Sequence, residues 1–156
     1  MKATHECLTA MREFLLTMPF AAPYEDLDTI DYGEVAAGSG EGSAIALAGD
    51  QTVSRKRSVT GRETHRKRTN FILILWREAN DNEFRRDIAN SLIRTIGWIN
   101  EEDAKRGTPD ANPALPRFSM TGYEALSADG GVKTVMLDKT RAEFQIQIHA
   151  DYEITY

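Results

Sequence analysis

The chain has 156 residues, 41% of them apolar and 28% charged, so it can bury one sizeable core but is too short for two comfortable domains. A formal net charge of −5 argues against general attraction to nucleic acid or to an anionic membrane. The single cysteine, Cys7, excludes an intrachain disulfide and a cysteine metal cluster, and it is typical of a reducing, intracellular location. Charged residues interrupt the N-terminus and no apolar run reaches about 18 residues, so we expect a soluble chain that is not exported by the general route.

The first predicted element is an amphipathic helix from Thr4 to Met18. Its apolar residues recur every three or four positions, and Pro19 ends it. Residues 20–42 are punctuated by glycines and rich in acids, which predicts a loop-rich connection with one short strand around Thr29–Tyr32.

Extended segments follow in the middle of the chain. Two short ones, Ala44–Ala48 and Thr52–Val59, lie around the sequence GDQ, and a break at Thr60–Gly61 separates them from a longer strand that ends at Trp76. The last part of that strand, Phe71–Trp76, is apolar at every position, which is typical of a strand at the centre of a sheet.

The second predicted helix follows Asn80 or Asp81, either of which can cap it. An apolar stripe at helical spacing marks its buried face: Phe84, Ile88, Leu92, Ile96 and Ile99. The residues from Asn100 to Arg117 include three prolines and one glycine, so we expect a long surface loop without regular structure.

Strands resume towards the C-terminus, near Phe118–Leu126, at Val132–Leu137 beyond the turn SADGG, and from Phe144 to Ile154. The last strand alternates apolar and polar residues almost to the end of the chain, so one face is expected to pack against the second helix. The order of elements predicts an α+β fold in which a mainly antiparallel sheet packs against two helices, as a single domain over residues 1–156.

Patterns typical of catalysis are weak in this chain. His149 and Asp151 share one face of the terminal strand, but no nucleophile or oxyanion donor accompanies them, so solvated strand residues are the better interpretation. Cys7 lies on the apolar stripe of the first helix, where a core thiol is expected. The sequence GSGEG lacks the ending of a phosphate-binding loop. We therefore expect no enzyme activity, no cofactor and no metal site.

The distribution of charge is more informative than its total. No lysine or arginine lies between Glu13 and Arg55, where acids accumulate, and residues 55–68 then hold seven cations against one acid, Glu63. If this basic segment forms a hairpin, like charges would lie side by side and destabilise a lone monomer. Three interpretations stay open: a solvated arm, contact with nucleic acid, and pairing with an acidic surface, including residues 25–50 of an identical neighbour.

Two groups of residues are therefore candidates for binding a partner. The first is the basic segment, and the second is the polar face of the terminal strand, which carries little charge and suits water or a wet contact with another subunit. The candidate residues are Arg55, Lys56, Arg57, Arg62, Arg66, Lys67, Arg68, Gln145, Gln147 and His149.

Several short sequences carry a resemblance to a known family. They are NFILILWRE, the helix that ends at Trp98, the following GWINEEDAKRGTPD, then MTGYEALSADGG and the closing RAEFQIQIHADYEITY, with GDQTV ahead of the core strand. In this order they resemble the tail terminator proteins of long-tailed bacteriophages and prophages, which are often labelled minor capsid proteins.

The resemblance implies a structural subunit that assembles as a hexameric ring on the last ring of the tail tube. Such a ring stops tube polymerisation and provides the head–tail joining surface. Its partners would be copies of itself, the tail tube protein and head–tail connector proteins, with room for DNA in the lumen and with no small-molecule substrate or membrane. Its location would be the head-proximal end of the virion tail, after assembly in the host cytoplasm.

One alternative function comes from a different class. A nucleic-acid-binding module would use Arg55–Arg68 as an arm that follows the phosphate backbone. The acidic total charge counts against it, and so does the absence of aromatic residues between those cations.

Overall fold

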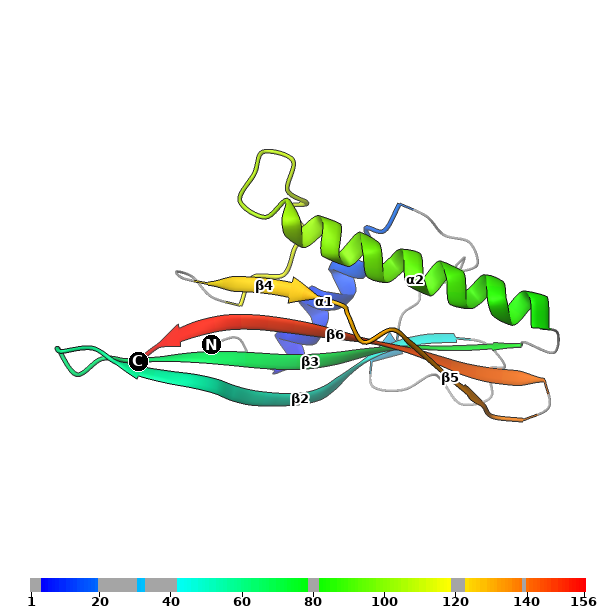
Figure 1. The fold of residues 1–156 in the computed structure, drawn as a ribbon, viewed down its shortest axis with the longest axis horizontal. Helices are drawn as coiled ribbons and strands as arrows, with labels where there is room; N and C mark the ends of the chain where they lie inside the picture. Colours follow the sequence, from blue (N-terminus) through cyan, green and yellow to red (C-terminus); the bar gives the residue numbers. More distant parts are fainter. Residues whose placement is uncertain (1–3, 20–30, 33–41, 79–81, 119–122, 139) are drawn as a thin grey trace.

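The computed structural model describes residues 4–19, 31–32, 42–78, 82–118, 123–138 and 140–156. Two helices and six strands are present in these residues (Figure 1). They follow one another as α1 (Thr4–Leu15), β1 (Asp31–Tyr32), β2 (Gly42–Arg57), β3 (Glu63–Glu78), α2 (Asn82–Ala104), β4 (Glu124–Ser127), β5 (Val132–Met136) and β6 (Arg141–Thr155). The predicted α+β fold is confirmed.

All six strands belong to one sheet. Its order is β1-β2-β3-β6-β4, and β5 also pairs with β6, so β4 and β5 share one long neighbour. Every pairing is antiparallel except the short parallel contact between β1 and β2. The predicted central strand is confirmed, because β3 pairs with β2 on one side and with β6 on the other.

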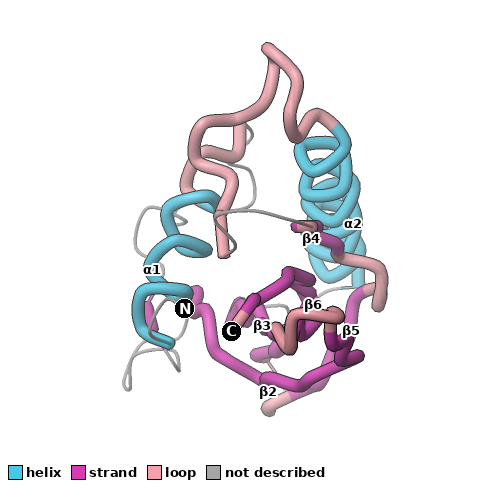
Figure 2. Tube along the Cα trace, turned by 90° about the vertical axis from the view of Figure 1, so that its left-hand side faces the viewer, coloured by secondary structure: helices cyan, strands magenta, loops and turns pink. Residues whose placement is uncertain are grey.

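The core lies between the sheet and the two helices, which are on the same side of it (Figure 2). We call the sheet face towards the helices the core face and the opposite face the outer face. Alternate side chains of β3 and β6 are buried on the core face, as the period of two requires. The two helices contact one another through aromatic side chains: Phe14 of α1 stacks on Trp98 of α2 with ring centroids 4.8 Å apart. The largest fully buried side chains are Phe14, Phe71, Phe144, Met11, Leu15, Ile45, Leu73, Leu75, Ile88 and Leu92.

Two predicted segments of β2 proved to be one continuous strand. The sequence pattern breaks where the register shifts, between Leu47 and Gly49 and again between Thr52 and Ser54. Each shift inserts an extra residue into β2 without ending its pairing with β3, which is the property of a β-bulge. Bulges also make the edge of β2 beyond β1, which pairs with no described strand, a poor template for pairing with another strand.

Helix α2 continues one turn beyond the predicted start of the loop and ends at Ala104. Side chains of this last part hold the backbone of β4 and the residue after it. Asp103 Oδ1 accepts a hydrogen bond from Leu126 N at 2.9 Å, and Asn100 exchanges two hydrogen bonds of 3.0 Å with the backbone of Ala128. Asn100 and Asp103 were predicted to lie in a loop or at its start, but they belong to α2 and hold it to β4 and the residue after β4.

The loop after α2 is only partly free. Leu115 and Pro116 are buried, and Asn112 Nδ2 donates to Thr17 Oγ1 beyond α1 at 2.9 Å. Arg106 bonds to Asp103 and to Glu124, each at 3.0 Å. The predicted exposure applies to the part around residues 107–110.

Three further predictions concern element boundaries. The short strand expected around Thr29–Tyr32 is present at Asp31–Tyr32, and the rest of residues 20–41 lies outside the described residues, as do Asn80 and Asp81. The predicted turn SADGG lies between β4 and β5, which each pair with β6 and not with one another.

Candidate partner-binding surfaces

Strands β2 and β3 extend past the core as a long hairpin, which we call the arm (residues 51–68). Its β2 side is exposed at every residue from 51 to 57, and the arm forms one end of the molecule (Figure 1). Strand β6 runs beside it as far as the pair Thr64–Thr155, and Tyr156 N donates to Glu63 O at 2.9 Å. The C-terminal strand therefore braces the arm almost to its turn.

The turn of the arm spans residues 58–62, where the break was predicted. Ser58 N donates to Arg62 O at 2.8 Å, and Gly61 N donates to Ser58 O at 3.0 Å. Gly61 has a φ of 86°, which glycine adopts without steric cost. Val59 is fully exposed in this turn.

Four of the seven cations in the basic segment are ion-paired within the chain. The pairs are Arg57–Glu63 at 3.1 Å, Arg66–Glu153 at 3.0 Å, Lys67–Asp50 at 2.9 Å and Arg68–Asp151 at 2.8 Å. The Arg68 pair is bidentate, with a second bond of 3.0 Å, and the Arg66 guanidinium also lies 4.4 Å from the centre of the Tyr123 ring. All four ion pairs fasten β3 to β2 or β6 and so stiffen the arm.

The ion pairs shift the pKa values of Glu153, Glu63 and Lys67 in the expected directions. A hydrogen bond from Arg66 lowers the pKa of Glu153 below its usual value. Hydrogen bonds from His65 and then from Arg57 lower the pKa of Glu63, and the bond to Asp50 raises the pKa of Lys67. Each shift favours the charged forms at neutral pH.

The prediction that like charges lie side by side in the hairpin was wrong. The opposing residues are Ser54–Arg66, Arg55–His65, Lys56–Thr64 and Arg57–Glu63. Across the other edge of β3, β6 places Glu153 opposite Arg66 and Asp151 opposite Arg68. The arm is therefore not strained by its own charge, and no partner is needed to relieve such strain.

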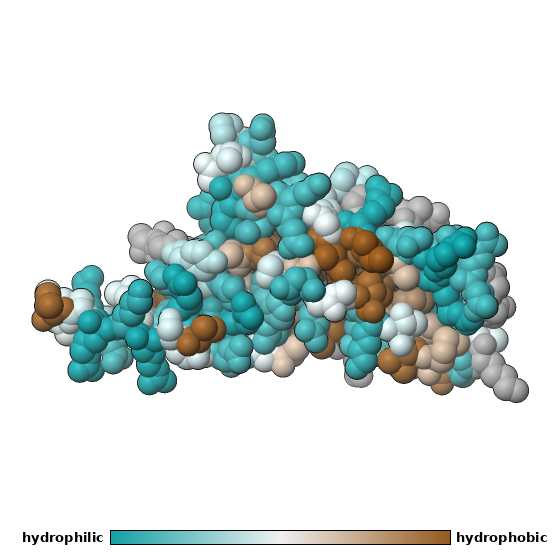
Figure 3. All heavy atoms as spheres, in the orientation of Figure 1, coloured by the Kyte–Doolittle hydropathy of each residue, from teal (hydrophilic) through white to brown (hydrophobic). Residues whose placement is uncertain are grey.

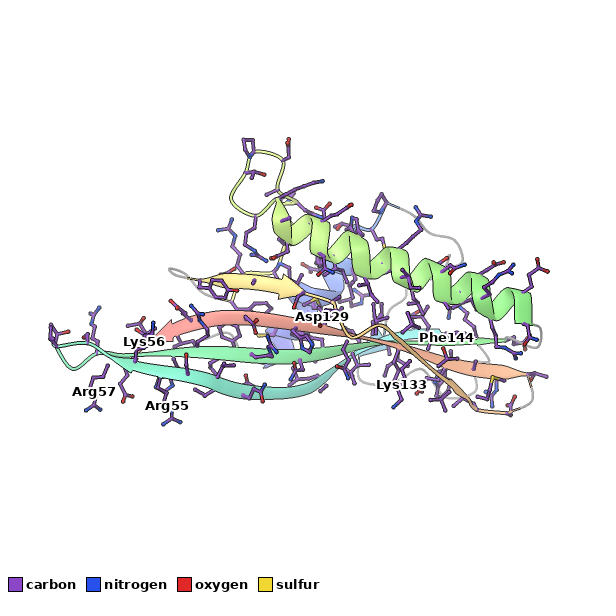
Figure 4. The ribbon with its side chains drawn as sticks, in the orientation of Figure 1. Arg55, Lys56, Arg57, Asp129, Lys133 and Phe144 are labelled. Atoms are coloured by element: carbon purple, nitrogen blue, oxygen red, sulfur yellow. The ribbon has the colours of Figure 1, made fainter. Side chains whose placement is uncertain are left out.

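Three cations of the basic segment remain available to a partner. Arg55, Lys56 and Arg62 are exposed and form no ion pair with any other described residue. Figure 4 shows Arg55 and Arg57 on one side of the arm and Lys56 on the other, as the pleat requires. Positive charge is thus offered from both sides of the arm close to its turn.

The second group of candidates lies on the outer face of β6. Gln147 is exposed, whereas Gln145 Nε2 donates to Glu143 Oε2 at 2.6 Å. His149 lies with Nδ1 2.5 Å from Asn70 Oδ1 and Nε2 3.5 Å from Asp129 Oδ1. Two of these three side chains thus have partners within the chain, which makes the outer face a weaker candidate than the arm.

The residues considered for catalysis are not brought together. Asp151 is held by Arg68, while the carboxylate beside His149 is Asp129. Cys7 is buried in the core, as expected. Within the described residues, no group of three or more His, Cys, Asp or Glu side chains could hold a metal ion. No described helix is both long and apolar enough to cross a membrane.

An acidic surface that was not predicted lies at the C-terminal end of α2. The last turn of this helix contains Glu101, Glu102 and Asp103 and no cation, although the helix macrodipole makes that end negative. Glu102 and Asp103 have cationic neighbours, but Glu101 and Asp110 are exposed and form no ion pair with any described residue. We call Glu101, Asp110 and the last turn of the helix the acidic end of α2. A predicted loop from Asn100 onward concealed it.

Exposed hydrophobic side chains form another surface that was not predicted. Ile93 on α2 is 58% exposed, and Val135, Met136 and Leu137 at the end of β5 are 40%, 45% and 40% exposed. In Figure 3, hydrophobic residues gather over the middle of α2 and beside β5, while the arm and the loop after α2 are mostly hydrophilic. The molecule therefore offers chemically different surfaces in different directions.

Comparison with known proteins adds no relative to these observations. No family model matches the chain, and no curated protein matches it.

Proposed function

We propose that this chain is a structural subunit of a ring that caps the tail tube of a long-tailed bacteriophage. The ring stops polymerisation of the tube and provides the surface to which head–tail connector proteins bind. One observation carries the proposal: a braced arm ends in Arg55, Lys56 and Arg62, which have no ion-pair partner among the described residues. A stiff projection with unmatched charge is suited to contact outside its own chain.

The architecture supports the proposal in a second way. The resemblance implies a small α+β subunit with a sheet flanked by helices, and the chain has these elements. A ring subunit needs separate surfaces for its own copies, for the tube and for the connector. The arm, the acidic end of α2 and the exposed hydrophobic residues on α2 and β5 are three such surfaces. The proposed location is the head-proximal end of the virion tail, after assembly in the host cytoplasm.

Nucleic-acid binding is the second candidate, because the same three cations favour it. Protein cations that neutralise backbone phosphates release counterions, so three contacts predict a log–log slope of about −2.7 for affinity against salt. A slope near this value for duplex DNA, lost when the three cations are replaced, would favour this function over the ring.

The experiment that tests the ring is a mass measurement of the purified chain, alone and with tail tube protein, combined with electron microscopy of tube lengths. We expect a closed oligomer of one stoichiometry at tube ends, and shorter, capped tubes when the chain is present during polymerisation. Tube protein alone is the control. A chain that stays monomeric with tube protein and leaves tube length unchanged would show that the proposed function is wrong.

A further inference from the structure

Three cations near the turn of the arm, Arg55, Lys56 and Arg62, have no ion pair with another described residue, and the arm that carries them is held in place by β6. Strand β6 pairs with β3 up to Thr64, so only the turn itself is unbraced. Seven exposed residues of β2, 51–57, extend about 20 Å at about 3.3 Å per residue. The charges are therefore held away from the body of their own chain and face outward.

The acidic end of α2 has the opposite charge, and two of its acids have no cationic partner among the described residues. Glu101 and Asp110 are exposed without an ion pair to a described residue, and Glu101 lies in the last turn of α2, where the negative end of the helix macrodipole already disfavours acids. Local rules that are broken without a compensating contact inside the chain indicate a contact made outside it.

Charge balance selects a second copy of this chain as the partner of the arm. The arm, residues 51–68, contains seven cations and one acid, which leaves 12 cations against 23 acids, or −11, on the rest of the chain. The arm of one copy is thus attracted to the body of another, whereas a polyanion such as DNA is attracted by the arm and repelled by the body. Among the acidic residues suggested by the sequence, Glu25, Asp26, Asp28, Glu34 and Glu41 lie outside the described residues. Asp31 belongs to β1, and Asp50 is engaged by Lys67.

The two surfaces lie in different parts of the molecule. The arm forms one end of the longest axis, and the acidic end of α2 lies above the sheet on the helix side (Figure 1). A contact between unlike surfaces leaves each copy with one arm and one acidic end to share with two neighbours, which produces a closed ring when the rotation between copies closes.

We propose that Arg55, Lys56 and Arg62 of one copy bind the acidic end of α2, around Glu101 and Asp110, in the next copy. This inference rests on the proposed function and names the contact that joins the subunits. The bond is electrostatic, because exposed charges on both sides are brought within ion-pair distance. It is therefore weakened by salt, which screens exposed charges over about 8–10 Å at physiological ionic strength.

A charge-reversal experiment on the full chain tests the contact. The arm variant carries Arg55→Glu, Lys56→Glu and Arg62→Glu, the acidic variant carries Glu101→Lys and Asp110→Lys, and a third variant combines all five. A matched control, Arg86→Glu with Arg94→Glu and Lys133→Glu, has the same number of reversed cations as the arm variant but on α2 and β5. Assembly is measured as the concentration of half-maximal oligomer by light scattering, and folding as the thermal melt.

We expect the control to assemble like the wild type. The arm and acidic variants should each need at least about tenfold more protein, because two or three exposed ion pairs supply about that factor. The combined variant should recover assembly, since the attraction is restored with its signs exchanged. Unchanged melts of the weakened variants would show that folding is not the cause.

Other outcomes overturn the inference without affecting the ring itself. If the arm variant weakens assembly and the combined variant does not recover, the arm binds a different surface. If no variant weakens assembly, the arm is a solvated projection. If wild-type chain retains duplex DNA at low salt and the arm variant alone loses it, the arm serves nucleic acid instead. Wild-type protein that neither assembles nor caps tubes refutes the proposed function, whatever the variants do.

Discussion

Leu73 provides the most direct test of the sheet as the centre of this fold. Its side chain is fully buried on the core face of β3, between Ile45 of β2 and Ile146 of β6. Leu73→Ala leaves a cavity that the backbone cannot fill, because β3 is hydrogen-bonded on both edges. We expect a loss of about 3–4 kcal/mol in the free energy of unfolding, in the middle of the range for such changes. In a chain of this length that loss lowers the melting temperature by roughly 6–16 °C.

The matched control is Ile74→Ala, one residue further along the same strand on the outer face. Ile74 is only partly buried, so we expect less than half the loss seen for Leu73→Ala, since less apolar surface is withdrawn from water. Urea denaturation followed by circular dichroism measures both values at 25 °C. Equal losses, or a loss below about 1 kcal/mol for Leu73→Ala, would mean that the two faces of β3 have been assigned wrongly.

Three further predictions concern the arm and the single thiol. Gly61→Ala should destabilise the turn by about 1–2 kcal/mol, because an L side chain is strained at φ 86° even though no atom lies within 4 Å of the added carbon, and a melting curve measures this loss. Glu153 has a pKa below the usual 4.5 through its bond to Arg66, so its stabilising effect is present above pH 4.5 and is lost as the pH falls through the lower folded-state pKa. The urea midpoints of wild type and Glu153→Gln should therefore differ at pH 6 and converge towards pH 3, and a constant difference would contradict this. Cys7 is 7% exposed, so an Ellman-type reagent should react with it only after unfolding, and rapid labelling of the native chain would contradict its place in the core.

Secondary structure was readable wherever the sequence repeats with a clear period. The alternation of β6 and the stripe of α2 depend only on which residues are apolar, and burial follows the same pattern in both elements. Predicted element boundaries were wrong where a local sequence signal competes with a tertiary contact. Asn100 and Asp103 suggest the end of a helix by composition, yet they continue α2 because the strand residues beside them supply hydrogen-bond partners.

The sequence predicted where the charge of the candidate site lies, but it did not predict which of its cations are ion-paired inside the chain. All ten candidate residues lie on the arm or on the outer face of β6, but four of the seven cations are paired inside the chain. Arg55 and Arg68 look equivalent in the sequence. The structure distinguishes them, because Asp151 stands opposite Arg68 and no carboxylate stands opposite Arg55.

The sequence by itself determined the fold class, the central strand, the faces of the terminal strand and the concentration of positive charge around one turn. These properties depend on residue type and spacing along the chain. Only the tertiary structure decided which charges are free. That outcome depends on the register of β3 against β2 and β6, where one bulged residue moves every later pair and where partners such as Arg66 and Glu153 are far apart in sequence. No local pattern encodes such a pairing, because it arises from hydrogen bonds between strands that meet only in the folded chain.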